Sequence, residues 1–169
     1  MSVPRSAVLA GSTGLFLAIF ASFAGAADTT VQISLWDKGP DSVVVDDAHT
    51  ALMGKLDMSG MKMALMGIKL DQATVPAGNV TFAVTNDSKD IIHEMILSRV
   101  PDGATELPYL VDEMRVNEDT TGHLGEVSEL DPGKSGSLTV NLTPGTYILY
   151  CNIPGHFIDG MWTMLTVTP

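Results

Sequence analysis

Short runs of alternating apolar and polar residues recur along most of the chain and are separated by turns rich in Gly, Pro and Asn. Such alternation predicts β-strands that bury one face. The expected strands are residues 31–36, 64–70, 80–85, 91–99, 137–142, 146–151 and 162–167. In the third of these, Val80, Phe82 and Val84 should lie in the core. Helical periodicity is weak, so the pattern indicates an all-β protein, and a β-sandwich in particular.

The connections between these strands are polar. Residues 75–79, 86–90 and 130–134 have the composition of turns, since they combine Pro, Gly, Asn, Asp and Ser. The connection 101–125 is long and acidic, and we expect it to be mostly loop with a short helix over 107–114, where Pro108 suits a first turn. His123 lies at its end, and we expect it to be exposed and without other ligands around it.

The N-terminal stretch is uncharged from residue 6 to residue 27 and follows Arg5. Its apolar centre and small closing residues are typical of a signal peptide, which predicts a leader over 1–26 with cleavage after Ala26 or Ala27. The domain would then be 27–169, with its core over about 65–169. After cleavage we expect no stable membrane insertion. An uncleaved anchor stays open as the alternative, because about 20 apolar residues span a bilayer.

The chain is acidic, with a formal net charge of -11 over 169 residues. This charge excludes binding to nucleic acid or anionic lipid by general electrostatics. An acidic surface can steer a basic partner, or it can serve solubility alone. The composition favours neither.

The candidate chemistry centres on Cys151, the single cysteine of the chain. A lone cysteine in an exported protein forms no internal disulfide, so it is either a free thiol or a ligand. His156 and Met161 follow it at intervals of five residues, and His93 lies upstream in a predicted strand. One thiolate, two imidazoles and a thioether are the ligands of a mononuclear blue-copper centre. We therefore predict a copper site at these four residues.

A second feature is a methionine-rich segment in the N-terminal half of the chain. It holds five of the ten methionines, and a second, weaker Cu(I) site there would use His49, Met53, Met58, Met61 and Met63. Thioethers suit Cu(I). Methionine is also an adaptable apolar filler, and the irregular spacing is compatible with simple packing. Both interpretations stay open.

Four segments of the sequence resemble the cupredoxin family, and the bacterial plastocyanin- and azurin-like copper proteins in particular. They are the C-x4-H-x4-M loop over 151–161, the strand around His93, the turn 130–136 and the strand 144–151. The resemblance implies a Greek-key β-sandwich with one type 1 copper. It also implies that His156 lies near the surface in an apolar patch where a partner docks. Glu94 departs from the family, in which Asn often follows the first histidine.

The resemblance implies an electron carrier that exchanges single electrons with redox partner proteins such as a cytochrome or an oxidase, and the predicted leader places it in the periplasm. The alternative is a copper-handling protein, for tolerance or as a metallochaperone, that uses the methionine-rich segment. A weaker third option is an accessory domain that serves a terminal oxidase. We expect no enzyme, because the sequence has no nucleophile-and-base arrangement, P-loop or dinucleotide fingerprint, and four protein ligands leave the metal no open position.

Overall fold

The structure is a computed structural model that describes residues 28–42, 54–56 and 64–169. The predicted leader over 1–26 lies outside the described residues. Nowhere in the described part does a helix have the length and apolar character needed to cross a membrane.

Strands make up almost all of the regular structure. They are β1 (Thr29–Asp37), β2 (Met66–Leu70), β3 (Thr74–Pro76), β4 (Gly78–Asn86), β5 (His93–Arg99), β6 (Tyr109–Leu110), β7 (Arg115–Val116), β8 (His123–Leu130), β9 (Ser135–Leu142), β10 (Gly145–Tyr150) and β11 (Trp162–Thr168). Within the described residues, short 3-10 helices accompany them, namely η1 (Pro40–Ser42), η3 (Val111–Glu113) and η4 (Glu118–Thr120). All seven predicted strands are therefore present, with ends shifted by a few residues.

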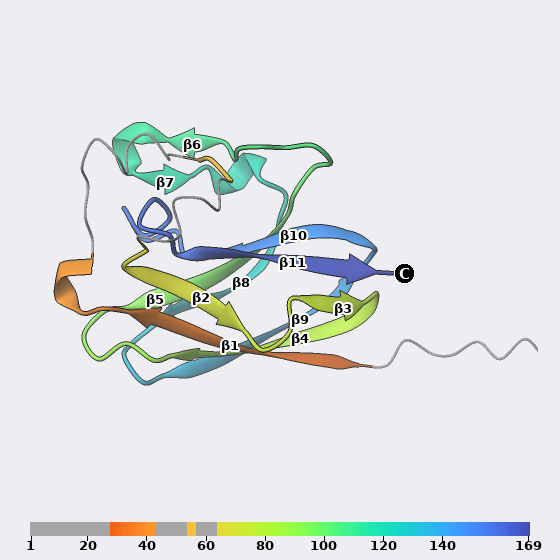
Figure 1. Ribbon diagram of the computed structural model, residues 1–169, viewed down its shortest axis with the longest axis horizontal. Coiled ribbons are helices and arrows are strands. Elements are labelled where there is room, and N and C mark those ends of the chain that lie inside the picture. Colours follow the sequence, from red (N-terminus) through yellow and green to blue (C-terminus); the bar gives the residue numbers. More distant parts are fainter. Residues whose placement is uncertain (1–27, 43–53, 57–63) are drawn as a thin grey trace, which may run out of the picture.

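Two sheets pack face to face, as Figure 1 shows. One has the order β2-β1-β4-β9 and the other β3-β11-β10-β5-β8. Each contains one parallel pair, β1 with β4 and β11 with β3, and the remaining neighbours are antiparallel. The predicted β-sandwich is confirmed.

The interior between the sheets is built by the predicted alternation. Val80, Phe82 and Val84 are at most 1% exposed, which confirms their predicted place in the core. On β10 the two sides differ: Tyr147 and Leu149 join the interior, whereas Ile148 and Tyr150 join a second apolar cluster with Phe157. That second cluster covers the other face of the five-stranded sheet, so β10 is buried on both faces.

Three parts of the sequence prediction are wrong. The predicted helix over 107–114 is a small hairpin, in which β6 pairs with β7 across η3. Tyr109 and Leu110 pair as a strand because Val116 and Arg115 lie opposite them. The expected turn over 75–79 contains the end of β3, which pairs in parallel with the far C-terminal β11. Such distant pairings override the local preference of a Pro- and Gly-containing stretch.

The third error concerns β8, which was expected to be part loop and part turn. Its burial is irregular, with Val127 as its one buried residue, because it forms an edge of the five-stranded sheet. Its pairing with β5 shifts register twice, between His93 and Met95 and between Leu97 and Ser98. Such bulges disturb the period-2 pattern that predicts a strand.

Asn86 joins three segments at the end of the sandwich where β5 begins. Its buried side chain donates from Nδ2 to the carbonyls of Ile91 (2.9 Å) and Leu130 (2.7 Å). Its Oδ1 accepts the backbone N–H of Ser88 at 3.0 Å. The turn between β4 and β5 is therefore fixed to β8, and β5 starts from a rigid point at His93.

We predict that Asn86→Ala lowers the free energy of unfolding of the copper-free protein by at least about 2 kcal/mol, since each buried polar group left unsatisfied costs about 1–3 kcal/mol. Chemical denaturation measures the change. Asn141→Ala is the matched control, because the exposed Asn141 side chain donates to the side chain of the exposed Asn79. It should change the free energy by no more than about 0.5 kcal/mol. Equal effects of the two substitutions would contradict the role given to Asn86.

Candidate metal centre

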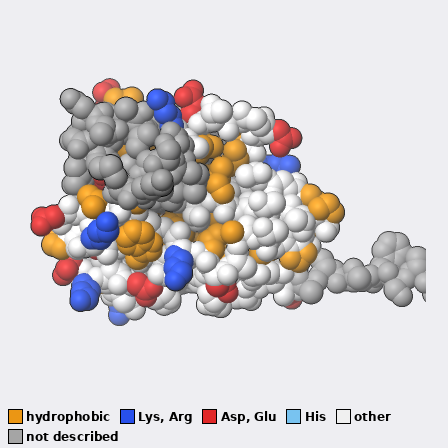
Figure 2. Space-filling view, in the orientation of Figure 1, with side chains coloured by type: hydrophobic (Ala, Val, Ile, Leu, Met, Phe, Trp, Pro, Cys, Tyr) orange, Lys and Arg blue, Asp and Glu red, His pale blue; other side chains and the backbone are white. Residues whose placement is uncertain are grey.

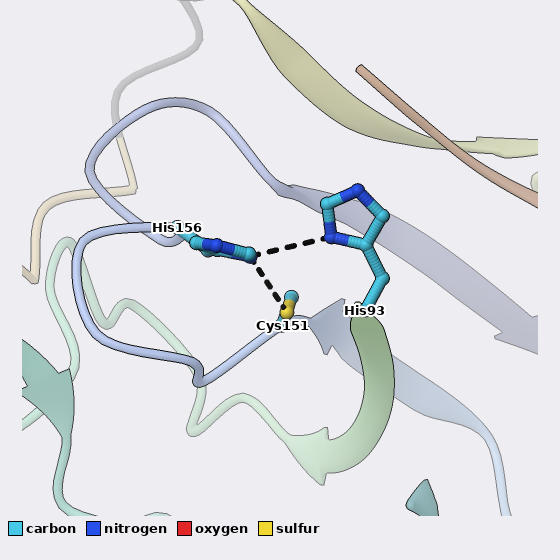
Figure 3. Close-up of side chains that lie close together, drawn as sticks. All are labelled: His93, Cys151 and His156. Atoms are coloured by element: carbon cyan, nitrogen blue, oxygen red, sulfur yellow. Dashed lines mark hydrogen bonds between the residues drawn. The ribbon is translucent and has the colours of Figure 1, made fainter. Parts of the chain in front are cut away.

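Three of the predicted ligands come from two neighbouring strands and the loop that follows one of them. His93 is the first residue of β5, and Cys151 directly follows β10, which pairs with β5. His156 lies in the loop that leads from β10 to β11. Figure 3 shows the three side chains pointing toward one another across this loop. The loop lies at the end of the sandwich opposite the C-terminus (Figure 1).

The donor atoms of these three residues lie within 4.8 Å of one another. The Nδ1 atom of His156 is 3.3 Å from the sulfur of Cys151 and 3.3 Å from Nδ1 of His93. The three residues are 0–3% exposed. A buried thiol and two imidazoles around one point fit copper, since sulfur suits Cu(I) and imidazole binds both oxidation states.

Met161 completes the set from the end of the same loop. It is fully buried, and its backbone N–H donates to the carbonyl of His156 at 3.0 Å. Its own carbonyl accepts the N–H of Cys151, also at 3.0 Å. These two bonds hold the thioether residue beside the other ligands. The buried site of His93, Cys151, His156 and Met161 is typical of a type 1 copper.

Two backbone N–H groups, those of Glu94 and Ile153, donate to the sulfur of Cys151. Burial nevertheless raises the pKa of the Cys151 thiol to about 12 in the metal-free chain, because these two bonds only partly offset the lost hydration. The sulfur therefore keeps its proton at neutral pH until a metal ion replaces it.

Both imidazoles are neutral at neutral pH. Burial, and to a smaller extent the neighbouring His93, lower the pKa of His156 to about 4, although Asp37 opposes this shift. Burial also lowers the pKa of His93, although Asp37 opposes that shift. Each ring consequently has one nitrogen with a free lone pair, which is the form that binds metals.

Asp37 is a residue of the site that sequence reasoning missed. Its Oδ2 lies 2.9 Å from Nε2 of His93, and its side chain is 3% exposed. Burial alone would raise the pKa of Asp37, but hydrogen bonds from Ser88, His93 and the N–H of Gly39 lower it. Because Asp37 ends β1, 56 residues before His93, no local pattern joins the two.

Glu94 lies beside His93 on β5 and connects this strand to the loop between β10 and β11, called here the ligand loop. Its Oε1 accepts the N–H of Asn152, the residue after Cys151, at 2.9 Å. The pKa of Glu94 is raised to about 7, mainly by burial; the bond from Asn152 opposes this shift, and nearby glutamates such as Glu118 add to it. Glu94 stands where the family often has Asn. It still joins the strand of His93 to the loop of Cys151, and its side-chain oxygen is the acceptor.

The β6–β7 hairpin is bound to the ligand loop from outside. The Asn152 side chain accepts the N–H of Val116 (2.7 Å) and donates to its carbonyl (2.9 Å). The N–H of Gly155 donates to the carbonyl of Met114 at 3.0 Å. Beneath the hairpin, Phe157 stacks on Trp162 with ring centroids 6.0 Å apart. The hairpin thus restrains the loop that carries His156.

Two further expectations are corrected by the structure. His156 is only 3% exposed, so the imidazole expected near the surface is buried. His123 is exposed as expected, but it does have neighbouring ligands: its donor atoms and those of Glu118 and Glu126 lie within 4.8 Å of one another. The proposed second Cu(I) site of His49, Met53, Met58, Met61 and Met63 lies outside the described residues. Met66, the fifth methionine of that segment, is buried in the core.

Residues 70–169, more than half of the chain, match the sulfocyanin (SoxE) domain family. Auracyanin-B of Chloroflexus aurantiacus is 46% identical over 52 residues, which are 30% of this chain and 22% of that protein. The match therefore spans about a fifth of the length of that relative.

Solved structures share the fold. Auracyanin from Roseiflexus castenholzii superposes with a TM-score of 0.50 at 20% identity and covers 86% of this chain and 100% of that one. Auracyanin A from Chloroflexus aurantiacus gives 0.51 at 18% identity, with 84% and 100% covered. At such identities the likeness concerns the fold.

We predict that Glu94→Ala lowers the free energy of unfolding of the copper-free protein by about 1–3 kcal/mol, because it leaves the N–H of Asn152 without its acceptor. Glu94→Gln keeps an oxygen at that position and should lose less. Thermal or chemical unfolding measures both. The exposed Glu129 gives the control, since Glu129→Ala should stay within about 0.5 kcal/mol of the parent chain. If Gln were as costly as Ala, the bond to Asn152 would not be the reason.

Proposed function

Because the chain belongs to the sulfocyanin (SoxE) domain family of the cupredoxins, we propose that it is a single-electron carrier with one type 1 copper. The observation that carries this proposal is the convergence of His93, Cys151 and His156 within 4.8 Å at a buried point. Auracyanin A, which shares the fold, is itself described as a blue copper protein. Bound by these ligands and Met161, copper supplies one electron by alternating between Cu(II) and Cu(I).

The residues of the chain supply the framework for that exchange. The N–H groups of Glu94 and Ile153 donate to the sulfur of Cys151 and stabilise its negative charge. The bond of Glu94 to Asn152 and the bonds of the hairpin hold the ligand loop. Ligand positions fixed before the metal arrives reduce the rearrangement that accompanies a change of oxidation state.

The same framework favours a carrier over an enzyme. Four protein ligands leave no open coordination position for a substrate. Burial of the ligands also keeps water away from the centre.

An electron carrier requires redox partners, and we propose partner proteins of the cytochrome or oxidase type. In the view of Figure 2, acidic and basic side chains are interspersed over the described surface.

We further propose that the protein is exported to the periplasm and works there. The support is the uncharged N-terminal stretch after Arg5 and the small residues at its end. Nothing in the copper site requires this location, so it is a separate proposal with its own test.

We predict that the parent chain binds one copper and has an intense visible band from the thiolate, and that Cys151→Ser abolishes the band. Met161→Leu is the matched control: it should keep copper and the band but raise the reduction potential, because the axial donor is lost. Absorption spectra, metal analysis and voltammetry measure these effects. A band that survives Cys151→Ser would refute the assignment. More than one copper per chain, reduced by substitution of Met53, Met58, Met61 and Met63, would favour the copper-handling alternative.

For export, we predict that the protein isolated from the periplasmic fraction of a Gram-negative host begins after Ala26 or Ala27. Mass spectrometry of the intact chain measures the start. Substitution of the small residues at the cleavage site should leave the leader attached. A full-length chain that stays in the membrane fraction would support the anchor instead.

A further inference from the structure

We propose that Asp37 is a positioning residue that fixes which nitrogen of His93 is offered to the metal. This inference rests on the proposed copper centre. The contact that carries it is the 2.9 Å distance between Oδ2 of Asp37 and Nε2 of His93. No pattern in the sequence connects these two residues, and the family resemblance gave Asp37 no role.

The chemistry of the two partners determines where the proton lies. A neutral imidazole has one N–H donor and one nitrogen with a lone pair, and an ionised carboxylate only accepts hydrogen bonds. The proton of His93 must therefore be on Nε2, where it is donated to Asp37. The lone pair is then on Nδ1, which lies 3.3 Å from Nδ1 of His156 and belongs to the group of converging donor atoms.

Asp37 is itself held firmly enough to orient a ring. Its Oδ1 accepts the N–H of Gly39 at 2.7 Å, and its carboxylate also accepts a hydrogen bond from Ser88. Its backbone pairs with Met66, the first residue of β2. The adjacent Lys38 donates its N–H to the carbonyl of Leu65 at 2.9 Å. The carboxylate thus has a fixed direction and little access to water.

The contact also crosses the sandwich. Asp37 belongs to the four-stranded sheet and His93 to the five-stranded sheet, while Ser88 lies in the connection between β4 and β5. A carboxylate that accepts from a metal-binding histidine orients the ring and makes it a stronger ligand, and its loss weakens metal binding by about 10- to 100-fold. Asp37 has the position and the geometry for that effect.

The first test uses the copper-free protein. In ¹⁵N NMR spectra of labelled histidine, His93 of the parent chain should show the tautomer with the proton on Nε2. Asp37→Ala should shift His93 toward a mixture of tautomers. Asp37→Asn keeps an oxygen acceptor without the charge, so it should retain the Nε2–H form in part. Circular dichroism of each variant checks that the sandwich remains folded.

The second test uses Cu(I) in competition with a chelator, together with the reduction potential. Asp37→Ala should bind Cu(I) about 10- to 100-fold more weakly. Its potential should also rise, because a negative charge near the metal is lost. Asp37→Asn loses the same charge but keeps an oxygen acceptor, so its potential should rise similarly while its affinity for Cu(I) falls less. Asp71→Ala is the matched control. Asp71 is an exposed carboxylate that accepts a hydrogen bond from the backbone N–H of Gln32, which lies on β1 as Asp37 does. It should leave the affinity and the potential unchanged.

A parent chain with the His93 proton on Nδ1 would overturn the proposal, whether or not the variants fold. So would a folded Asp37→Ala protein with unchanged tautomer, affinity and potential. If the tautomer responds but the parent chain binds no copper, the copper function fails while the pairing of Asp37 with His93 stands. If the parent chain binds copper with the visible band and only the Asp37 variants lack an effect, the function stands and this inference fails.

Discussion

The register between β5 and β10 is the constraint on which the centre depends. These strands are antiparallel neighbours, with Tyr150 opposite Ile96, so the end of β10 and the start of β5 meet at one end of the sandwich. Along β10, alternate residues face the interior or the outer aromatic cluster. A slip of one residue would exchange the environments of Tyr150 and Cys151. The large apolar side chains on both faces of β10 therefore determine where the thiol points.

Burial of the candidate ligands also buries polar groups around them, and neighbouring residues supply the hydrogen-bond partners that these groups need. Unpaired polar groups in a dry interior are costly, so each one needs a partner. Asn86 fixes the turn before His93, Asp37 accepts from that imidazole, and Glu94 accepts from the loop beyond Cys151. Asn152 then bonds the loop to the outer hairpin. The centre is consequently organised by hydrogen bonds that come from both sheets.

The sequence predicted most strands and identified the candidate ligands because their signals are local. Alternation identified the interior strands, and Cys151, His156 and Met161 lie in one short loop. The contribution of Asp37 was not predictable, since it arises only when β1 packs across from β5. Likewise β3 forms through a pairing with the distant β11, and the hairpin at Tyr109 replaces an expected helix because of its cross-strand partners. What failed were the contacts and elements that form only through pairing with distant segments and leave no local pattern, such as β3 and the contact of Asp37 with His93.

The exposed edge strand β8 has a consequence for the behaviour of the protein in concentrated solution. An unpaired edge offers free backbone donors and acceptors to a second copy of the chain, which is a route to aggregation. Here the edge is kinked by two register shifts and carries the exposed acids Glu126 and Glu129. The β8 edge of a second molecule would be repelled by these like charges, and the irregular backbone of β8 would disturb regular strand pairing. The bulges and exposed polar residues that made β8 hard to predict from the sequence are therefore the same features that oppose extension of the sheet by a second molecule.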